Sequence, residues 1–470
     1  MKNGELFKYI GGRSCAILGM GVSNLPLAKQ LCEWGTELTV YDKRSAEELG
    51  DEAAALMSRG VRFVTSDGDF SGIGEKLIFR SPGIRPDKGG IQAAVESGSE
   101  LTSEIELTIM LSPTVTYGIT GSDGKTTTTT LTGKFLEAAE AGRVFVGGNI
   151  GSPLLCRVGD MTDKDKTVLE LSSFQLMTSK VAPDFAAITN VSPNHLDWHR
   201  GMEEYVTAKK NIVGDNTKRL VTNADCADTL RIANDCSAKE IYLFSSKLTA
   251  KDIFRLCPRC CAAITLVGDN IVVSDSQADT AVLDIKDINV PGMHNVENFM
   301  TAIGLTFGAI PTEVYGKVAR DFFGVEHRLE FVRCLDGVSY YNSSIDSSPT
   351  RTAAALSAMK GKNLVIICGG YDKNLDYAPL GEAICTHGGI RGVVLTGATA
   401  QKIGRAVEAF SPCHPPLIYQ NNFANAVVAA KNMAAAGDCV VLTPASASFD
   451  AFKNFDERGK TFKRIVNELC

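Results

Sequence analysis

The residues best suited to chemistry lie in one short stretch. A β-branched run, residues 115–120, leads into Gly-Ser-Asp-Gly-Lys-Thr-Thr and then into a segment that can continue as a helix. Glycines let successive backbone N–H groups turn toward an anion, and the start of a helix adds a positive dipole end. A lysine can then hold the β- and γ-phosphates, and a threonine hydroxyl can bind the accompanying Mg²⁺. The stretch predicts a nucleoside triphosphate site comprising Gly121, Ser122, Asp123, Gly124, Lys125, Thr126 and Thr127.

The spacing leaves an alternative open, because only two residues separate Gly121 from Gly124 where the common phosphate loop has four. The alternative is a purely structural glycine turn before a threonine-rich helix. Two other residues favour the phosphate site. Glu170 lies inside a strand-like apolar run and needs a partner or a metal if it is buried. His195 follows another apolar strand; alone it is more often structural, but beside a magnesium-nucleotide loop it completes a metal-phosphate site.

A second glycine motif begins near the N-terminus. The apolar run at 14–18 enters Gly-x-Gly-x-x-Asn, a helical segment follows at 25–34, and a strand at 37–41 ends in an acid. This pattern predicts a Rossmann-like half that binds a nucleotide diphosphate, with NAD binding or a purely structural βαβ unit as alternatives. The turn after the strand that ends near residue 80 is either part of that site or only a turn. The candidate residues are Gly21, Val22, Ser23, Asp42, Lys43, Ser81, Pro82 and Gly83.

Other polar positions are less specific by themselves. Asn149 lies in a glycine turn and could reach a ligand, and Asn298 shares a helical face with Asn295, which suits either capping or hydrogen bonding to a base. Lys209 and Lys210 lie in a helical segment, where composition alone predicts solvated surface lysines. Residues 101–111 form an amphipathic segment that ends at Ser-Pro, and after residue 324 strands alternate with helices, as in a doubly wound sheet.

Composition bounds the class of protein. At 470 residues the chain should form about three domains, and its net charge of -6 argues against a general nucleic-acid binder. We expect no secretory signal and no membrane insertion, because the long apolar stretch at 290–310 is interrupted by polar residues. The 14 cysteines are scattered, which favours reduced thiols in a cytoplasm. Cys257, Cys260 and Cys261 cluster without a second pair at zinc-site spacing, so incidental cysteines are favoured there.

Taken in order along the chain, these motifs resemble the Mur ligases. The resemblance is carried by Gly-x-x-Gly-Lys-Thr-Thr at 121–127, Leu-Glu-Leu-Ser-Ser-Phe-Gln-Leu at 169–176, Asn-x-x-x-Asn-His-Leu-Asp at 190–197, Gly-x-His-Asn-x-x-Asn at 292–298, His-Arg-Leu-Glu at 327–330 and Asp-Ser at 346–347. It implies an α/β fold of three domains. These are a Rossmann-like domain for a UDP-linked substrate (1–112), a central P-loop-type ATPase domain with a mainly parallel sheet (113–325), and a Rossmann-like domain for an amino acid (326–470).

The resemblance also implies a reaction and its cofactors. UDP-N-acetylmuramoyl-L-alanine would be phosphorylated by ATP on its terminal carboxylate, and D-glutamate would displace the phosphate from the acyl phosphate. Positioning and charge neutralisation are what a protein contributes to such a transfer. By the family pattern Lys125 holds the phosphates, Thr126 and Glu170 bind one Mg²⁺, and His195 binds a second. Lys209, spaced from Tyr205 as in the family, would carry a carbamate, which turns a cation near the metals into an anion.

The remaining roles follow the same pattern. The resemblance places adenine, phosphate and ribose contacts at Asn298, Arg328 and Asp346, muramoyl contacts at Asn149 and His195, and D-glutamate contacts at Thr350, Lys373, Ser448 and Phe455. Two departures from the pattern are Ser122-Asp123, where many relatives have Thr-Asn, and Ser348-Pro349. The expected partners are these small molecules, and we expect no nucleic acid among them. We also expect the protein to be a monomer in the cytoplasm.

Three competing functions stay open at this stage. A ligase of the same superfamily could add L-alanine, a diamino acid or a folate-linked glutamate, although a diamino-acid enzyme should present an acid pair where this chain has Lys373 and Ser448. A nicotinamide-dependent oxidoreductase would explain the first glycine motif but not Lys125, Glu170 or His195. A non-catalytic scaffold would bind ATP and release no phosphate.

Overall fold

The computed structural model describes residues 4–21, 23–66, 68–196, 198–373 and 375–469. Its strands, among these residues, form three sheets with helices between them, so the predicted α/β class is confirmed. The chain divides into two compact units. The first extends to Ile288 and includes Met293–Arg320, and the second comprises Asn289–Gly292 and Asp321 onward. The first unit thus holds the N-terminal and central sheets, and the three predicted domain boundaries remain a proposal.

The N-terminal sheet is parallel, in the order β3-β2-β1-β4-β5. Alternate residues of β1 enter different cores, Cys15 and Ile17 on one face and Ala16 and Leu18 on the other, as expected for a sheet covered on both sides. Its elements are α1 (Gly4–Ile10), β1 (Cys15–Leu18), α2 (Asn24–Glu33), β2 (Leu38–Asp42), α3 (Ala46–Leu49), α4 (Asp51–Met57), β3 (Arg62–Thr65), β4 (Leu77–Arg80), α5 (Gly89–Glu96), β5 (Glu100–Thr102) and α6 (Glu104–Leu111).

The amphipathic segment at 101–111 comprises two elements. Leu101 and Thr102 belong to edge strand β5, which pairs with β4. Ser103 then caps α6 by accepting a hydrogen bond from the N–H of Glu106. Pairing at the sheet edge and a serine N-cap therefore set the boundary between strand and helix.

The central sheet runs in the order β14-β13-β12-β11-β10-β9-β6-β8-β7, parallel except for the antiparallel pairs that β13 makes. Strand β6, which precedes the phosphate loop, lies between β8 and β9. The strands are β6 (Val115–Thr120), β7 (Val144–Gly148), β8 (Lys166–Glu170), β9 (Phe185–Ile188), β10 (Arg219–Asn223), β11 (Glu240–Ser245), β12 (Ala262–Val267), β13 (Asn270–Asp275) and β14 (Asp279–Asp284). A mainly parallel order brings the carboxyl ends of β8, β6 and β9 to one edge.

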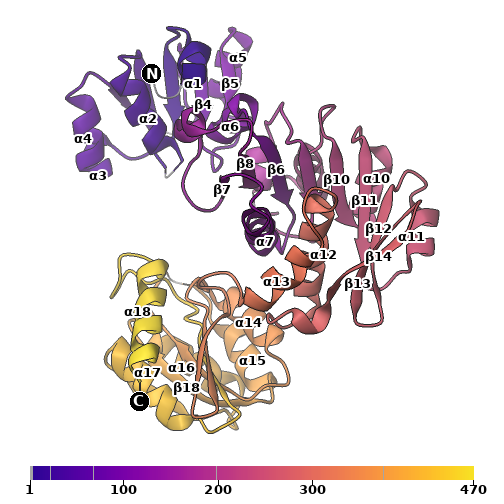
Figure 1. The fold of residues 1–470 in the computed structure, drawn as a ribbon. Helices are drawn as coiled ribbons and strands as arrows, with labels where there is room; N and C mark the ends of the chain where they lie inside the picture. The colour runs from indigo at the N-terminus through magenta and orange to yellow at the C-terminus, as the bar shows by residue number, and fades with distance from the viewer. Residues whose placement is uncertain (1–3, 22, 67, 197, 374, 470) are drawn as a thin grey trace. The chain divides into compact units, whose positions relative to one another are not determined.

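Two long helices cover this sheet side by side, α7 and α12 (Figure 1). The ring of Phe135 in α7 lies 6.1 Å from that of Phe299 in α12. The helices are α7 (Lys125–Ala138), α8 (Ser173–Leu176), α9 (Met202–Lys210), α10 (Ala227–Asp235), α11 (Ala250–Leu256), α12 (Met293–Thr306) and α13 (Glu313–Asp321), with 3₁₀ turns at Leu155–Asp160 and Ile285–Asp287. No helix in the described part of the chain has the length and apolar character to cross a membrane.

The second unit is built on a sheet in the order β15-β16-β20-β17-β18-β19, of which only β15 pairs antiparallel. Alternate residues of β17 separate two cores, Leu364 and Ile366 facing one way and Val365 and Ile367 the other. Its elements are β15 (Glu330–Leu335), β16 (Val338–Asn342), α14 (Pro349–Ala358), β17 (Leu364–Cys368), α15 (Ala378–Thr386), β18 (Ile390–Thr396), α16 (Ala400–Phe410), β19 (Leu417–Gln420), α17 (Phe423–Met433), β20 (Cys439–Leu442) and α18 (Phe455–Glu468). The predicted doubly wound sheet is present.

Candidate active site

The phosphate loop joins β6 to α7, as the sequence predicts. Gly121 and Gly124 have φ of 150° and 79°, and Gly124 is the N-cap of α7. A Cβ added to Gly121 would lie 1.9 Å from the Thr189 hydroxyl oxygen, and one on Gly124 would lie 2.2 Å from Asn298 Oδ1. Both positions therefore require glycine, for conformation and for space.

The loop backbone is fastened to the segment that follows β9. The N–H groups of Ser122 and Asp123 donate to the carbonyl and side-chain oxygens of Asn190, at 3.0 and 2.9 Å. The Ser122 hydroxyl donates to the Ser192 carbonyl at 2.9 Å. The Asp123 side chain is exposed, so its charge faces solvent, which explains how an acid is tolerated in a phosphate loop. The departure Ser122-Asp123 thus fits the fold.

Two lysines meet at the loop. Lys125 Nζ donates to the carbonyls of Gly121 and Ser122, both at 2.9 Å, and Lys209 Nζ donates to the Gly121 carbonyl at 2.7 Å. Lys209 is 1% exposed, and its Nζ lies 4.4 Å from the ring centroid of Tyr205. Burial lowers the pKa of the Lys209 amine to about 6, with a further lowering from the Lys125 charge. The composition-based expectation of a surface lysine is wrong for Lys209 and correct for Lys210, which is exposed.

Glu170 ends strand β8, next to the loop. Its side chain is 2% exposed, and Asn149 Nδ2 donates to Oε1 at 2.8 Å. Among the described residues Oε2 is buried without a hydrogen-bond partner. A buried carboxylate oxygen left without a donor costs free energy unless a cation occupies it. A half-satisfied carboxylate of this kind fits Mg²⁺, for which the Thr126 hydroxyl at the start of α7 is a second candidate ligand, and the loop fits the phosphates of a nucleotide.

His195 lies on the opposite flank of β6, in the segment after β9. Its φ of 55° is uncommon for a residue with a side chain, its side chain is exposed, and its ring lies 5.0 Å from that of Phe174. Because β6 separates β8 from β9, Glu170 and His195 bracket the loop from two sides. The sequence could place each residue after a strand, but only the strand order shows that they flank the same loop.

Asn298 belongs to the first unit and lies at the start of α7, against Gly124. Its Oδ1 accepts from the Thr128 hydroxyl at 3.3 Å, and its Nδ2 donates to Asn295 Oδ1 at 3.2 Å. Both asparagines thus share one helical face, as predicted. Their contacts tie α12 to the phosphate loop, which supports the structural half of the prediction and leaves base binding a proposal.

The N-terminal glycine loop lies beside the turn that follows β4. A Cβ on Gly19 would lie 3.1 Å from Ser81 Cβ, so the loop containing Gly21 and Ser23 adjoins Ser81, Pro82 and Gly83. Asn24, in place of the third glycine, donates from Nδ2 to the Gly19 carbonyl at 3.0 Å. Val22 lies outside the described residues. Lys43 is exposed, and its side chain lies close to Gly68.

Asp42 is already engaged by protein groups. It accepts the N–H of Met20 at 2.8 Å and the Arg44 guanidinium at 3.1 and 3.2 Å. Burial alone would raise the pKa of the Asp42 carboxyl, but the hydrogen bonds from Arg44 and Met20 lower it below its usual value. Sequence reasoning missed Arg44, whose signal was a cation two residues after the strand-end acid. A partly exposed arginine at this loop suits a diphosphate better than an acid does.

In the second unit the remaining candidates gather at the carboxyl ends of β16, β20 and β17, which are neighbours in the sheet. Asp346 follows β16, Ser448 follows β20, and Lys373 follows β17. Asp346 accepts from the Thr443 hydroxyl at 3.0 Å, and its burial raises the pKa of its carboxyl to about 6. Arg328 is exposed between two residues of positive φ, His327 (65°) and Leu329 (43°).

The four residues expected to contact an amino acid differ in exposure. Lys373 and Thr350 are exposed, Phe455 is 41% exposed, and Ser448 is buried. Lys373 Nζ lies 5.6 Å from the ring of Phe449, which sequence reasoning did not single out. Ser348 caps α14, with Pro349 as its first residue, so the second departure from the family pattern starts a helix. The structure brings these loops to one edge, and their roles remain proposals.

Arg458 is a buried residue that the sequence did not reveal. It is 2% exposed and donates to the Ser344 hydroxyl and to the carbonyls of Ser344, Ser446 and Ala447, at 2.9 to 3.1 Å. Burial lowers the pKa of its guanidinium to about 10, so the group stays charged at neutral pH. It fastens together the loops that carry Asp346 and Ser448.

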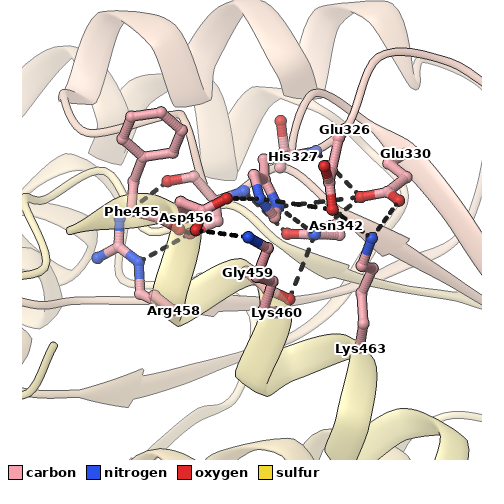
Figure 2. Close-up of polar contacts among 12 residues, drawn as sticks. Glu326, His327, Glu330, Asn342, Phe455, Asp456, Arg458, Gly459, Lys460 and Lys463 are labelled. Carbon is pink, nitrogen blue, oxygen red and sulfur yellow. Dashed lines mark hydrogen bonds and ion pairs between the residues drawn. The ribbon is translucent and has the colours of Figure 1, made fainter. Parts of the chain in front are cut away.

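A polar network beside Arg328 resembles a metal site but is complete without one (Figure 2). Among the described residues, Glu326, His327 and Glu330 form the only set of three possible ligands whose atoms lie close enough together. Lys463 Nζ lies 2.7 and 2.8 Å from the two glutamates, and His327 Nε2 lies 3.1 Å from Asp456. The cysteine cluster at 257–261 does not form such a set among the described residues.

Fold and site together define a class: an α/β protein with a phosphate loop, a magnesium-compatible acid beside it, and two further sheets whose strand ends carry polar loops. Residues 119–306 match the family model described as Mur ligase middle domain, and residues 327–446 match the one described as Mur ligase, glutamate ligase domain. The chain belongs to the Mur ligase family, as its motifs predict.

Relatives and solved structures agree with this assignment. A protein named UDP-N-acetylmuramoylalanine--D-glutamate ligase from Ruminiclostridium cellulolyticum is 40% identical over 98% of this chain and 98% of its own. One of the same name from Clostridium acetobutylicum is 41% identical over 99% of this chain and 98% of its own. The crystal structure of a UDP-N-acetylmuramate-alanine ligase from Thermotoga maritima shares the fold, with a TM-score of 0.57, 15% identity, and coverage of 97% of this chain and 99% of that one. The predicted ATP-dependent ligase function and its use of ATP and Mg²⁺ are confirmed. The family assignment favours the ligase over the oxidoreductase alternative.

Proposed function

We propose that this protein joins D-glutamate to the terminal carboxylate of UDP-N-acetylmuramoyl-L-alanine, with ATP converted to ADP and phosphate. The observation that carries the proposal is the phosphate loop of β6 with the buried, half-satisfied Glu170 beside it, in a chain similar along its whole length to D-glutamate ligases. A site for ATP and a metal is what a carboxylate needs in order to become an electrophile at neutral pH.

The reaction balances in two steps. A carboxylate oxygen of the substrate attacks the γ-phosphorus of ATP, the bond to the β-phosphate oxygen breaks, and ADP leaves. The nitrogen of D-glutamate then attacks the acyl carbon, loses a proton, and phosphate leaves. Neither step needs a covalent bond to the protein, so positioning and charge neutralisation account for the catalysis.

The first unit would hold the ATP phosphates and the metals. Lys125 is half-buried at the loop and, by releasing its two carbonyl acceptors, would reach the phosphates. Thr126 and Glu170 would bind one Mg²⁺, and His195 a second. Bound Mg²⁺ neutralises charge that develops on the transferred phosphoryl group. Asn298 would contact the adenine. By the family pattern Arg328 and Asp346 would contact the phosphates and the ribose.

The two organic substrates would use the other strand ends. The loops carrying Gly21, Ser23, Lys43 and Ser81 would hold the uridine diphosphate, with Asn149 near the muramoyl part. Thr350, Lys373, Ser448 and Phe455 would hold D-glutamate, whose two carboxylates suit an exposed lysine beside a buried hydroxyl. A diamino-acid ligase should present two acidic residues to the distal amine, and this chain has Lys373 and Ser448 instead. This difference favours glutamate over a diamino acid as the substrate.

A carbamate on Lys209 is a finer part of this proposal. The relatives' names lend it no support; its support here is the burial of Lys209 and the lowered pKa of its amine, about 6, which leaves the nitrogen neutral at pH 7. A neutral amine attacks CO₂ and loses a proton to give an N-carboxylate, an anion beside the metals. Incubation with ¹³C-bicarbonate should give a carbamate NMR signal that Lys209→Ala removes and Lys210→Ala, its exposed neighbour, retains. A signal that survives Lys209→Ala would assign the modification elsewhere.

The test of the function is phosphate release from ATP and Mg²⁺ with UDP-N-acetylmuramoyl-L-alanine. D-Glutamate, L-glutamate, L-alanine and meso-diaminopimelate would be offered in parallel. Release with D-glutamate alone is expected. Release with another amino acid would keep the ATP site and overturn the roles of Lys373 and Ser448, and no release would refute the ligase proposal. We expect a cytoplasmic monomer. Sedimentation with and without substrates would measure its oligomeric state.

A further inference from the structure

Arg80 is the last residue of β4 and is 1% exposed. One terminal nitrogen of its guanidinium, Nη1, donates to three carbonyls of the turn that follows: those of Ile84 at 2.6 Å, Pro82 at 3.2 Å and Ser81 at 3.4 Å. The side chain therefore lies inside the turn and fixes its backbone.

The other terminal nitrogen connects this turn to the central part of the first unit. Arg80 Nη2 donates to the carbonyl of Phe174, in α8, at 2.8 Å, and to the hydroxyl oxygen of Thr178 at 3.0 Å. One side chain thus joins the end of a strand in the N-terminal sheet to the segment that follows Glu170 in the central sheet.

The buried positive charge of Arg80 is held by uncharged acceptors. Among the described residues its acceptors are backbone carbonyls and one hydroxyl rather than carboxylates, and its Nε–H has no hydrogen-bond partner among them. Burial lowers the pKa of the guanidinium to about 10, against the opposing effect of the Glu106 charge, so it remains protonated at neutral pH. A buried cation is costly, and a hydrocarbon of the same volume would avoid that cost. What only the arginine supplies is a donor for each of these oxygens at once.

A second set of contacts runs in parallel from the same turn. Trp198 Nε1 donates to the Gly83 carbonyl at 3.4 Å, and Arg85 lies over the Trp198 ring at 5.0 Å and donates to its carbonyl at 2.5 Å. The Phe174 ring lies 4.4 Å from Trp198 and 5.0 Å from His195. The turn is therefore attached both to α8 and to the segment that carries His195.

We propose that Arg80 is a positioning residue that sets the place of the Ser81–Ile84 turn, and so of the UDP-linked substrate, relative to the phosphate-activating centre. This inference rests on the proposed function, because contact between the substrate and this turn is itself proposed. The substrate spans two sheets: its nucleotide end lies at the turn, and its carboxylate must reach the γ-phosphate at the loop after β6. A displaced turn therefore misplaces the reacting carboxylate while leaving the ATP site intact.

The kinetic test compares Arg80→Met, which keeps the volume, and Arg80→Lys, which keeps the charge, with Arg59→Met, an exposed arginine of the same sheet region. Arg80→Met should raise the KM for the UDP-linked substrate about tenfold and lower kcat about tenfold. Its KM for D-glutamate and its Kd for ATP by calorimetry should stay within about twofold of wild type. Arg80→Lys should be intermediate and Arg59→Met normal. Equal losses for all three substrates, or none, would overturn the proposal.

A readout that does not depend on turnover separates positioning from folding. Amide hydrogen exchange should rise at residues 81–85 and 174–178 in Arg80→Met and stay unchanged in β6 and α7. Should that variant fail to fold, Thr178→Val removes one acceptor and retains the charge; it should raise the same KM about threefold. Unchanged exchange at 81–85 would refute the inference. Wild-type protein assayed in parallel tells a failed inference from a failed proposed function, because only the latter abolishes wild-type phosphate release.

Discussion

Two buried cations, one in each unit, are treated in opposite ways. Among the described residues Lys209, beside the phosphate loop, donates to one acceptor, the Gly121 carbonyl. A second lysine lies nearby, and the pKa of the Lys209 amine falls to about 6. Arg458 beside the C-terminal loops has four acceptors, and burial lowers the pKa of its guanidinium only to about 10. A cation whose neighbours leave it poorly satisfied becomes a reactive neutral base, whereas one enclosed by carbonyls remains charged and fixes backbone.

The largest expected effect is the loss of activity on replacing Lys125, the lysine that shares the Gly121 carbonyl with Lys209. Lys125→Ala should lower kcat for phosphate release at least about a thousandfold, because it removes the cation of the loop that would hold the transferred phosphate. The measurement is steady-state phosphate release, with Lys134→Ala, an exposed lysine of the same helix, as control. Near-normal activity of Lys125→Ala would refute the phosphate-loop assignment.

The next effect concerns stability and pH at Lys209. Between pH 6 and 10.5 the unfolded chain binds a proton on this amine that the folded chain lacks, so stability rises with pH across that window. Lys209→Met should therefore stabilise the ligand-free protein by roughly 4 kcal/mol at pH 7 and by less than half of that at pH 9. Thermal unfolding in CO₂-free buffer measures it, beside Lys210→Met. A gain independent of pH would mean that Lys209 is not the titrating group.

Arg458 should behave in the opposite sense. Arg458→Met leaves four buried acceptors without a donor and should cost about 3 kcal/mol of stability at every pH from 6 to 9. Arg464→Met, on the exposed side of the same helix, should cost less than about 0.5 kcal/mol. Unfolding of the second unit, followed by hydrogen exchange in β16 and β20, gives the comparison. A loss that grows or shrinks strongly with pH would contradict a permanently charged Arg458.

The smallest expected effect is at Asp346, whose carboxyl faces the Arg458 region. Its pKa is raised to about 6 by burial, so the penalty of ionising it in the folded state is absent below its ordinary value of 3.8 and complete above pH 6. Asp346→Asn should stabilise the protein by about 1 to 2 kcal/mol at pH 7.5 and by nothing measurable at pH 4. It should also weaken ATP binding if Asp346 holds the ribose. Equal stability changes at both pH values would contradict the raised pKa.

Much of the fold was readable from the chain alone. The β-branched run at 115–120 and the glycines after it correspond to β6 and the phosphate loop, at the predicted places. The amphipathic pattern at 101–111 did not show where a strand ends and a helix begins, because the pairing of Leu101 depends on Ile78 of a neighbouring strand. Local pattern reports local conformation, and sheet edges are set by residues distant in sequence.

For the candidate site, too, local sequence features and contacts between distant segments determine different things. By itself, the sequence determined which residues could hold phosphates and a metal, since glycine spacing, a lysine and a strand-end acid are local features, and their order along the chain placed the protein in its family. Only the tertiary structure decided that Lys209 is buried while Lys210 is not, and that Asp42 is held by Arg44. It also decided that Arg80 lies inside the turn that follows it, and that Arg458 joins the loops after β16 and β20. Burial and partners depend on contacts between distant segments, and these set the pKa values and positions on which chemistry depends.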